Sequence, residues 1–305
     1  MVIRGLNAGV SILLMLLIGI LYGVVLGYLV AYVNIPPWIA TLAGFLAFRG
    51  LGTQILSSSS STGSISVKSV AGFMAVFSGK LFSTKLNVLN VPCMTAGAVA
   101  AVLVVLLNVI SRVSKVRKGY EADSLLVVAL KSVVEAAVIL LFTYKLANAG
   151  GIPVVLVWVV IVVLFYHFIT DKTTIGRHFY VVGGNREAAR LSGVNTKRIM
   201  FIAYLNMAII SAITTWTVLA RFQAANSTAG TNYEMDAISA CVVGGVSAYG
   251  GAGKIFGMVI GATLIGVINL GMSLMNIDAN FQKVIKGVVL LGAVAFDIIS
   301  KKNAK

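Results

Sequence analysis

The chain has 305 residues, of which 59% are apolar and only 11% are charged. A water-soluble domain has about 25% charged residues, so this composition excludes one. The formal net charge is +15, and there are only 4 Pro and 2 Cys, which excludes collagen-like and disulfide-rich proteins. Because Lys and Arg in short loops set the orientation of membrane proteins, the charge does not require a nucleic-acid partner. We expect a polytopic membrane protein that contacts lipid and no nucleic acid.

The apolar runs predict an all-α transmembrane helical bundle, since no other open structure satisfies its backbone groups inside lipid. A span needs about 20 apolar residues. Seven runs approach or exceed this length: Val10 to Val33, Leu89 to Ser111, Leu125 to Ala147, Ile152 to Thr170, Ile199 to Ala220, Ile255 to Met275 and Val284 to Ser300. Pro36 to Leu56, which contains Arg49, and Met235 to Tyr249, which is short and ends in glycines, are expected to be broken or re-entrant.

Three clusters of basic residues predict the orientation. They are Arg112, Lys115, Arg117 and Lys118; Lys172, Arg177, Arg186, Arg190, Lys197 and Arg198; and Lys301, Lys302 and Lys305. An even number of expected spans separates each pair, so the clusters share one side, which the positive-inside tendency identifies as the cytoplasm. The C-terminus is then cytoplasmic and Met1 is outside. Because a start on the outside is unusual, we expect the natural chain to begin further upstream.

The sequence has no motif for catalysis or nucleotide binding. A phosphate loop requires Gly, four residues and then Gly-Lys-Ser/Thr, whereas Gly253 and Lys254 are followed by Ile255. The stretch from Gly244 to Gly253 is instead expected to form a tight turn between two spans. The two Cys and two His lack the spacing of a metal site. We expect no enzymatic activity, cofactor or metal in this chain, so ATP-driven transport would require a separate ATPase.

The second basic loop, residues 171–198, is the most informative segment. Asn185 is a good N-cap for a short helix, Glu187 lies in the first turn, where the helix dipole favours an anion, and Gly193 is placed to end the helix. Two glycines before Asn185 predict a turn. A helix this short is not stable alone, which suggests a docking partner. A solvated loop that serves only topology is the alternative.

Within this loop, Glu187-Ala188-Ala189 followed by Gly193 resembles the EAA-x-x-x-G pattern of ABC-importer permeases. Residues 35–56 and 170–300 resemble the ribose/xylose/galactose-type sugar permeases, with the xylose/multiple-sugar branch closest. The matching residues include Arg49-Gly50, Gly183-Gly184-Asn185, Ala229-Gly230-Thr231, Tyr233-Glu234, Asp236-Ala237-Ile238, Gly244-Gly245-Val246-Ser247 and Lys286-Gly287. Members usually carry two additional spans before the first one here, and an Asn-Asn-Gly where this chain has Asn269-Leu270-Gly271.

The resemblance implies one transmembrane permease domain over residues 1–305, in the plasma (inner) membrane of a bacterium. It also implies a second permease subunit, identical or related, an ABC ATPase that binds ATP and Mg²⁺, and an extracytoplasmic sugar-binding protein. Residues 171–198 would be the cytoplasmic coupling loop. Its predicted ATPase-coupling residues are Gly183, Gly184, Asn185, Arg186, Glu187, Ala188, Ala189, Arg190 and Gly193.

Polar residues within the spans are candidates for the sugar pathway: Asn206, Ser211, Thr214, Thr215 and Asn269, with Trp216 as a stacking surface. The alternative is that such residues only join helices by hydrogen bonds. Gly257, Gly261 and Gly266 are expected at close helix contacts.

Intramembrane charges are functional candidates by default, so their partners matter. Lys131 and Glu135, four residues apart, are expected to neutralise each other. Arg221 is the expected partner of Glu234 and Asp236, and Lys286 and Asp297 are expected to extend toward opposite ends of the last span.

Two other functions remain open. A branched-chain amino acid permease would share the fold and the coupling loop, but would favour charge pairs along the pathway of a zwitterion. A secondary carrier would show inverted repeats around a midplane ion site and would need no ATPase-docking loop. The sequence does not identify the monosaccharide.

Overall fold

The computed structural model describes residues 5–60, 63–67, 70–81, 90–117, 119 and 124–303, without the side chains of residues 71, 297 and 300–303. The expectations for Met1, Lys118 and Lys305, and for the side chains of Asp297, Lys301 and Lys302, lie outside this part. The chain divides into two compact units, Met1–Phe73 with Val159–Lys305, and Met74–Trp158. Each unit is described by itself.

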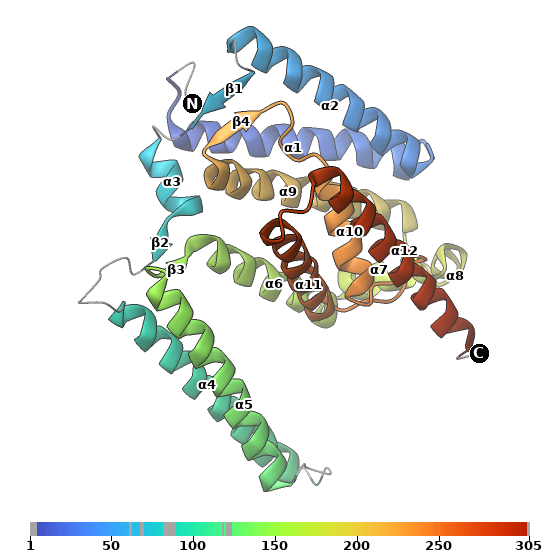
Figure 1. Ribbon diagram of the computed structural model, residues 1–305. Coiled ribbons are helices and arrows are strands. Elements are labelled where there is room, and N and C mark those ends of the chain that lie inside the picture. The colour runs from blue at the N-terminus through green and yellow to red at the C-terminus, as the bar shows by residue number, and fades with distance from the viewer. Residues whose placement is uncertain are drawn as a thin grey trace. The chain divides into compact units, whose positions relative to one another are not determined.

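The described residues are mostly helical (Figure 1). In chain order the elements are α1 (Ala8–Ala31), α2 (Pro37–Ser59), β1 (Ser64–Ser66), α3 (Ala71–Ser78), β2 (Lys80–Leu81), α4 (Val91–Arg117), α5 (Leu125–Asn148), β3 (Ile152–Pro153), α6 (Val154–Lys172), α7 (Thr174–Gly184), α8 (Arg186–Leu191), α9 (Thr196–Phe222), β4 (Ala224–Asn226), α10 (Tyr233–Val243), α11 (Ile255–Leu274) and α12 (Ala279–Asn303).

Within the described part of the chain, eight helices are long and apolar enough to cross a membrane. They include all seven firmly predicted spans. The expectation of a broken segment from Pro36 to Leu56 is wrong, because α2 is one helix of 23 residues. Its first residue is Pro37, and proline is well suited to the first position of a helix. In contrast, α10 has 11 residues and a length of about 16 Å, too short to span about 30 Å of hydrocarbon.

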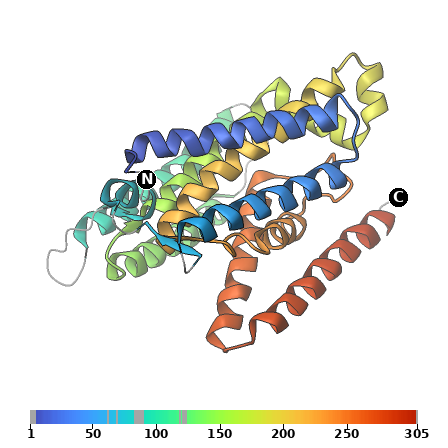
Figure 2. The ribbon, with the colours of Figure 1, turned by 90° about the horizontal axis from the view of Figure 1, so that it is seen from above.

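In the first unit, α1 lies alongside α9 through small residues (Figure 2). A Cβ atom on Gly19 would lie 2.8 Å from Cβ of Ala212, and one on Gly23 would lie 2.7 Å from Cβ of Ala208. Such small-residue faces let helix backbones approach closely in a membrane, where van der Waals packing drives association. The buried face of α9 is therefore the face that α1 covers at these positions.

Helices α10 and α11 also pack closely through small residues. A Cβ atom on Gly261 would lie 2.0 Å from the Ala240 carbonyl oxygen, and one on Gly257 would lie 2.2 Å from that of Gly244. The expectation of close helix contacts at these two glycines is confirmed. It is wrong for Gly266, which has no atom within 4 Å of the Cβ position, because that residue lies on a different face of α11.

A two-stranded sheet joins the ends of α2 and α9 (Figure 1). Strand β1 pairs antiparallel with β4, with Ser64 opposite Asn226 and Ser66 opposite Ala224. Because β4 follows α9 directly, this pairing fixes where the chain leaves α9 and begins the segment that leads to α10.

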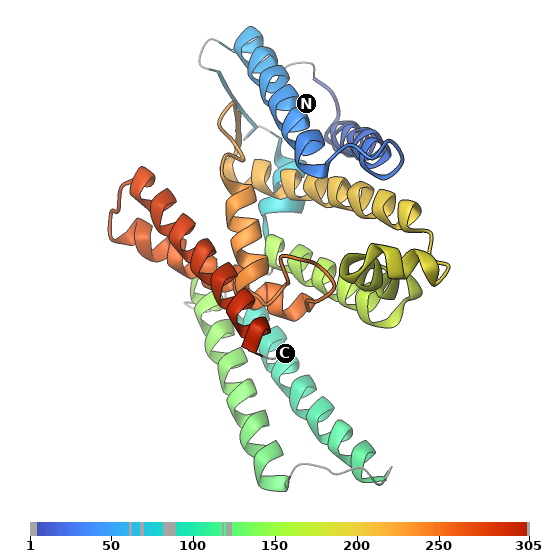
Figure 3. The ribbon, with the colours of Figure 1, turned by 90° about the vertical axis from the view of Figure 1, so that its right-hand side faces the viewer.

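In the second unit, α4 and α5 form an antiparallel hairpin (Figure 3), and β2 pairs with β3. A Cβ atom on Gly97 of α4 would lie 2.2 Å from Cγ2 of Thr143 on α5. The Asn108 amide donates to Glu135 Oε2 at 2.7 Å and to Ser132 Oγ at 3.2 Å. The expected pairing of Glu135 with Lys131 is therefore wrong, since the carboxylate turns toward the neighbouring helix rather than along its own.

Candidate coupling and translocation sites

Helix α8 has well-defined caps at both ends. Asn185 Oδ1 accepts from the Ala188 backbone N–H at 3.0 Å, as the sequence predicts for an N-cap. At the other end, the Gly193 N–H donates to Arg190 O and the Val194 N–H donates to Ala189 O, both at 3.0 Å. Gly193 has φ +81°. This is a Schellman motif, which requires a left-handed residue after the helix and stops it there. The caps stabilise a helix of six residues, which is too short to be stable without them.

One face of α8 is anchored and the opposite face is open. Ala189 is fully buried in a cluster with Val182 and Ile199. The side chains of Glu187 and Arg190 are 71% and 68% exposed and form an ion pair of 3.0 Å with each other. Leu191 is 83% exposed, which is unusual for a leucine that lies outside the spans. The buried face fixes α8 against α7 and α9, and the exposed face presents Leu191 beside the charged side chains of Glu187 and Arg190.

The segment before α8 is a helix that the sequence reasoning missed. Gly183 and Gly184 were expected in a turn, but they form the last turn of α7, and only Asn185 is extended between α7 and α8. The missed signal was Thr173, whose hydroxyl accepts from the Gly176 N–H at 3.2 Å and caps α7. The predicted coupling segment therefore contains two linked helices, α7 and α8.

The end of α7 rests on the glycine-rich turn between α10 and α11. A Cβ atom on Gly250 would lie 2.4 Å from the Gly183 carbonyl oxygen, and one on Gly251 would lie 2.7 Å from Cα of Gly184. The Tyr180 hydroxyl donates to Gly253 O at 2.9 Å. Sequence reasoning expected a tight turn at these glycines. The structure adds that their small size lets two backbones touch and links α7 to both α10 and α11.

Three helices of the first unit share one charged cluster. Lys286 Nζ on α12 lies 2.7 Å from Oδ1 of Asp236 on α10 and donates to Oδ2 at 2.9 Å. Asn269 on α11 also donates to Oδ2, at 3.2 Å. The expected Arg221 partner for Asp236 is wrong, and so is the expectation that Lys286 extends toward an end of its span. Both residues face inward because α10 packs against α12 at this level.

The polar residues of α9 lie in different surroundings. Asn206 accepts a hydrogen bond from the Tyr166 hydroxyl of α6. Thr214 and Thr215 are exposed, and each hydroxyl donates to the carbonyl oxygen four residues earlier at 2.9 Å. Trp216 is 8% exposed, on the same face as Ala212. The structure therefore does not bring the predicted pathway residues together, although Thr215 lines a cavity of about 330 Å³ beside the segment that follows α9.

A second cavity of about 500 Å³ adjoins the glycine-rich turn. Besides glycines of that turn, its lining includes His167, Asp171 and Phe256, to which the sequence reasoning gave no role. His167 Nδ1 lies 3.4 Å from Asp171 Oδ2, and its ring centroid is 4.7 Å from that of Phe256. No spacing signal marks these residues, because α6 and α11 are far apart in sequence.

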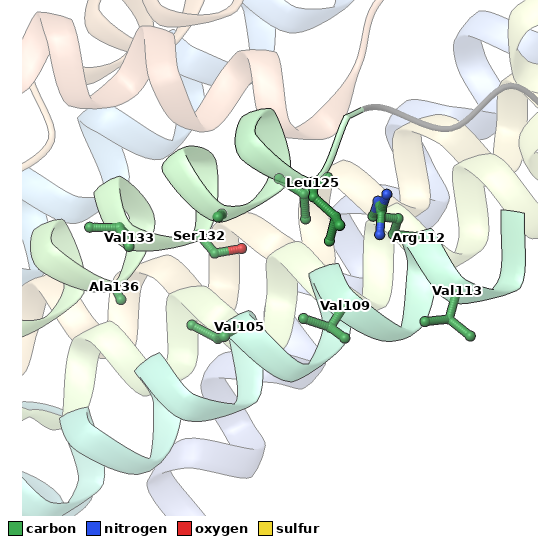
Figure 4. Close-up of a pocket in the computed structure, with 10 residues that line it drawn as sticks. Val105, Val109, Arg112, Val113, Leu125, Ser132, Val133 and Ala136 are labelled. Atoms are coloured by element: carbon green, nitrogen blue, oxygen red, sulfur yellow. The ribbon is translucent and has the colours of Figure 1, made fainter. Parts of the chain in front are cut away.

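The groove between α4 and α5 has a different character (Figure 4). It measures about 340 Å³, and apolar residues, among them Val105, Val109 and Val133, form most of its walls. Arg112 lies near Leu125 at one end, and Ser132 is a further polar side chain in the lining. A polyol needs hydrogen-bond partners for its hydroxyl groups, since an unpaired buried hydroxyl is costly. This groove therefore does not fit a sugar.

The fold defines a class of protein, a polytopic helical membrane protein. A family model described as "Branched-chain amino acid transport system / permease component" matches residues 1–294, and the chain belongs to this family. The chain is 34% identical over 299 residues to the xylose transport system permease protein of Haemophilus influenzae, covering 98% of this chain and 76% of that protein.

Two further relatives agree with this assignment. The xylose transport system permease protein of Escherichia coli is 30% identical over 296 residues, 96% of this chain and 72% of its own length. The ribose import permease protein of Escherichia coli is 40% identical over 148 residues, 48% of this chain and 46% of its own. No solved structure matches the chain significantly. The relatives are transport subunits and not enzymes, and the chain is a multi-pass membrane protein.

Proposed function

We propose that this chain is the membrane-spanning subunit of an ATP-driven ABC importer that carries a monosaccharide into the cytoplasm. The observation that carries the proposal is the 34% identity to a xylose permease across 98% of the chain. The two-helix coupling segment supports it, because a permease driven by a separate ATPase needs a rigid element through which movement is transmitted.

The contacts suggest how that movement would travel. A force on the exposed face of α8 would pass through Ala189 and Val182 to α7. From α7 it would reach the glycine-rich turn, where Gly250 and Gly251 touch the backbone of Gly183 and Gly184. The turn connects α10 and α11, so both would shift together. The predicted coupling residues 183–190 and Gly193 belong to this assembly, within a single permease domain of residues 1–305.

The partners and the orientation are part of the proposal. An ABC ATPase, which binds ATP and Mg²⁺, would dock on residues 171–198, so this chain needs no cofactor of its own. A second permease subunit would complete the pore and an extracytoplasmic binding protein would deliver the sugar. The basic loops support a bacterial inner-membrane location with a cytoplasmic C-terminus.

A branched-chain amino acid permease is the alternative, since the family description names that substrate class. It is less supported, because the relatives that cover almost the whole chain are named as xylose permeases. A secondary carrier has no support from these relatives.

Uptake by cells that lack this chain, with and without the restored gene, tests the function. We expect restored uptake of radiolabelled D-xylose, D-ribose or D-galactose and unchanged uptake of leucine. Restored leucine uptake with no change for any sugar would contradict the proposal and favour the amino acid alternative.

The coupling role is tested separately with Glu187→Lys. Glu187 is 71% exposed, so the substitution leaves the fold intact but places a third positive charge beside Arg186 and Arg190. We expect the ATPase to be lost from the affinity-purified protein and uptake to fall at least about tenfold, which corresponds to about 1.4 kcal/mol. Asp278→Lys, the same change of charge on the segment between α11 and α12, is the control for charge; because Asp278 Oδ1 accepts from the Asn280 N–H at 2.8 Å, the amount of folded protein in the membrane is measured for both variants. Normal uptake by the Glu187 variant would refute the assignment.

A further inference from the structure

Arg49 is an intramembrane charge whose role the coupling mechanism does not explain. It lies ten residues before the end of α2 at Ser59, which is about 15 Å along the helix axis. Ionisable residues at such depth usually mark a substrate pathway or a polar cavity. The Arg49 guanidinium donates a hydrogen bond to the Thr231 hydroxyl, and its Cζ lies 5.8 Å from the centroid of the Phe45 ring.

The partner of Arg49 belongs to a non-helical segment, residues 226–232, which runs from the last residue of β4 to the start of α10. The hydrogen bond to Arg49 and the cavity wall shared by Phe45 and Gly230 place this segment beside the middle of α2. It is ordered by its own bonds, among them Thr231 Oγ1 to Thr228 O at 2.7 Å, and Gly230 has φ +79°. Non-helical backbone at this depth is tolerated only where it is buried in protein or lines a water-filled cavity.

Such a cavity lies between α2 and this segment. It has a volume of about 320 Å³, within the range of small-molecule sites. Its walls combine the aromatic rings of Phe45 and Phe48 with the polar side chains of Arg49, Thr53, Asn226 and Ser227. The cavity lined by Thr215 also includes Asn226 and Gly230 in its walls, so one segment separates two cavities.

We propose that the cavity between α2 and residues 226–232 binds a neutral monosaccharide on its way through the permease. The inference rests on the proposed function and names the residues that would contact the substrate. Arg49 and Asn226 offer planar arrays of donors for ring hydroxyls, and Phe45 or Phe48 offers an apolar face for the C–H groups of the sugar ring. A small ligand is usually oriented by a few polar groups in an otherwise apolar pocket.

The lining also distinguishes a sugar from an amino acid. Arg49 would suit the carboxylate of a zwitterion, but an ammonium group in the same cavity would need a carboxylate partner. The described residues that line the cavity include no Asp or Glu, and neither do those of the adjacent cavity. Asp236 is already paired with Lys286.

Cysteine labelling tests the site in the assembled transporter in native membranes. The two native cysteines, Cys93 and Cys241, are replaced by Ala, and Thr53→Cys is introduced in the cavity. Leu51→Cys is the matched control, at similar depth on the opposite face of α2, where Leu51 is 60% exposed. The probe is a membrane-impermeant thiol reagent added from outside, with D-xylose, D-ribose, D-galactose or leucine present in turn.

We expect the reagent to label Thr53→Cys but not Leu51→Cys, and one of the three sugars to slow that labelling at least threefold. Labelling at equal rates with and without every sugar, or no labelling of Thr53→Cys, would overturn the site. Protection by leucine alone would instead overturn the monosaccharide class and the proposed function, while leaving a substrate cavity in place.

Arg49 variants provide a second measurement that does not depend on cysteine. Arg49→Met should reduce sugar uptake at least tenfold while the ATPase still copurifies, because α8 is untouched. Arg49→Lys keeps the charge but loses the planar donors, so it should restore only part of the uptake. Wild-type uptake by Arg49→Met would refute the assignment, and loss of the ATPase would show that Arg49 is needed only for assembly.

Discussion

The ion pair between Asp236 and Lys286 allows a sharp test of the packing around α10. We consider Asp236→Asn, Lys286→Met and the double variant. Each single substitution leaves one charge without its partner between three helices, whereas the double variant removes both. An unpaired buried charge is costly. The losses of unfolding free energy in the two single variants should therefore add up to more than the loss in the double variant.

The magnitude follows from the geometry. Lys286 Nζ lies 2.7 Å from Asp236 Oδ1, and the two side chains are only 21% and 29% exposed. At an effective dielectric constant of about 20, the attraction at this distance is about 6 kcal/mol before the cost of desolvation. Removing one partner of such a buried pair costs about 3 to 5 kcal/mol. Because water reaches the partly exposed edge of the pair, we expect each single variant to lose about 3 kcal/mol of unfolding free energy. We expect a coupling energy of about 2 kcal/mol between the two residues.

Unfolding of the purified protein by sodium dodecyl sulfate in mixed micelles, followed by fluorescence of its 3 Trp, measures these free energies. Arg221→Met is the matched control, since Arg221 has the same charge and was the partner expected from sequence. It should change the free energy of unfolding by less than about 0.5 kcal/mol. Additive single variants, or a cost for Arg221→Met equal to that for Lys286→Met, would refute the reasoning.

Other substitutions test the glycine contacts and the caps of α8. Gly261→Val should separate α11 from Ala240 and lower the melting temperature by several degrees, because its Cβ would lie 2.0 Å from a carbonyl oxygen; Gly266→Val, with open space around it, should melt like the wild type. Asn185→Ala should cost about 1 kcal/mol through loss of the N-cap, and faster proteolysis within the coupling segment is the readout. Gly193→Val should weaken the ATPase interaction more than Gly193→Asn, because asparagine tolerates φ +81° far better than a β-branched residue.

Much of this protein follows from local sequence. Hydropathy predicts the spans, since lipid requires continuous helices and about 20 apolar residues to cross. Asn185 and Gly193 predict both ends of α8, because capping depends on neighbours within one turn. The pattern in residues 187–193 resembles that of ABC-importer permeases, and the proposed ATPase partner rests on this resemblance.

The pairings between distant helices were decided only by the tertiary structure. The sequence suggested Arg221 as the partner of Asp236, but the packing of α10 against α12 places Lys286 there. The contact of Gly250 with Gly183 and the bond from Arg49 to Thr231 likewise join segments with no shared periodicity. Hydropathy reports only whether a residue avoids water, so it cannot say which helix a polar side chain faces. That depends on how small residues let particular helices approach.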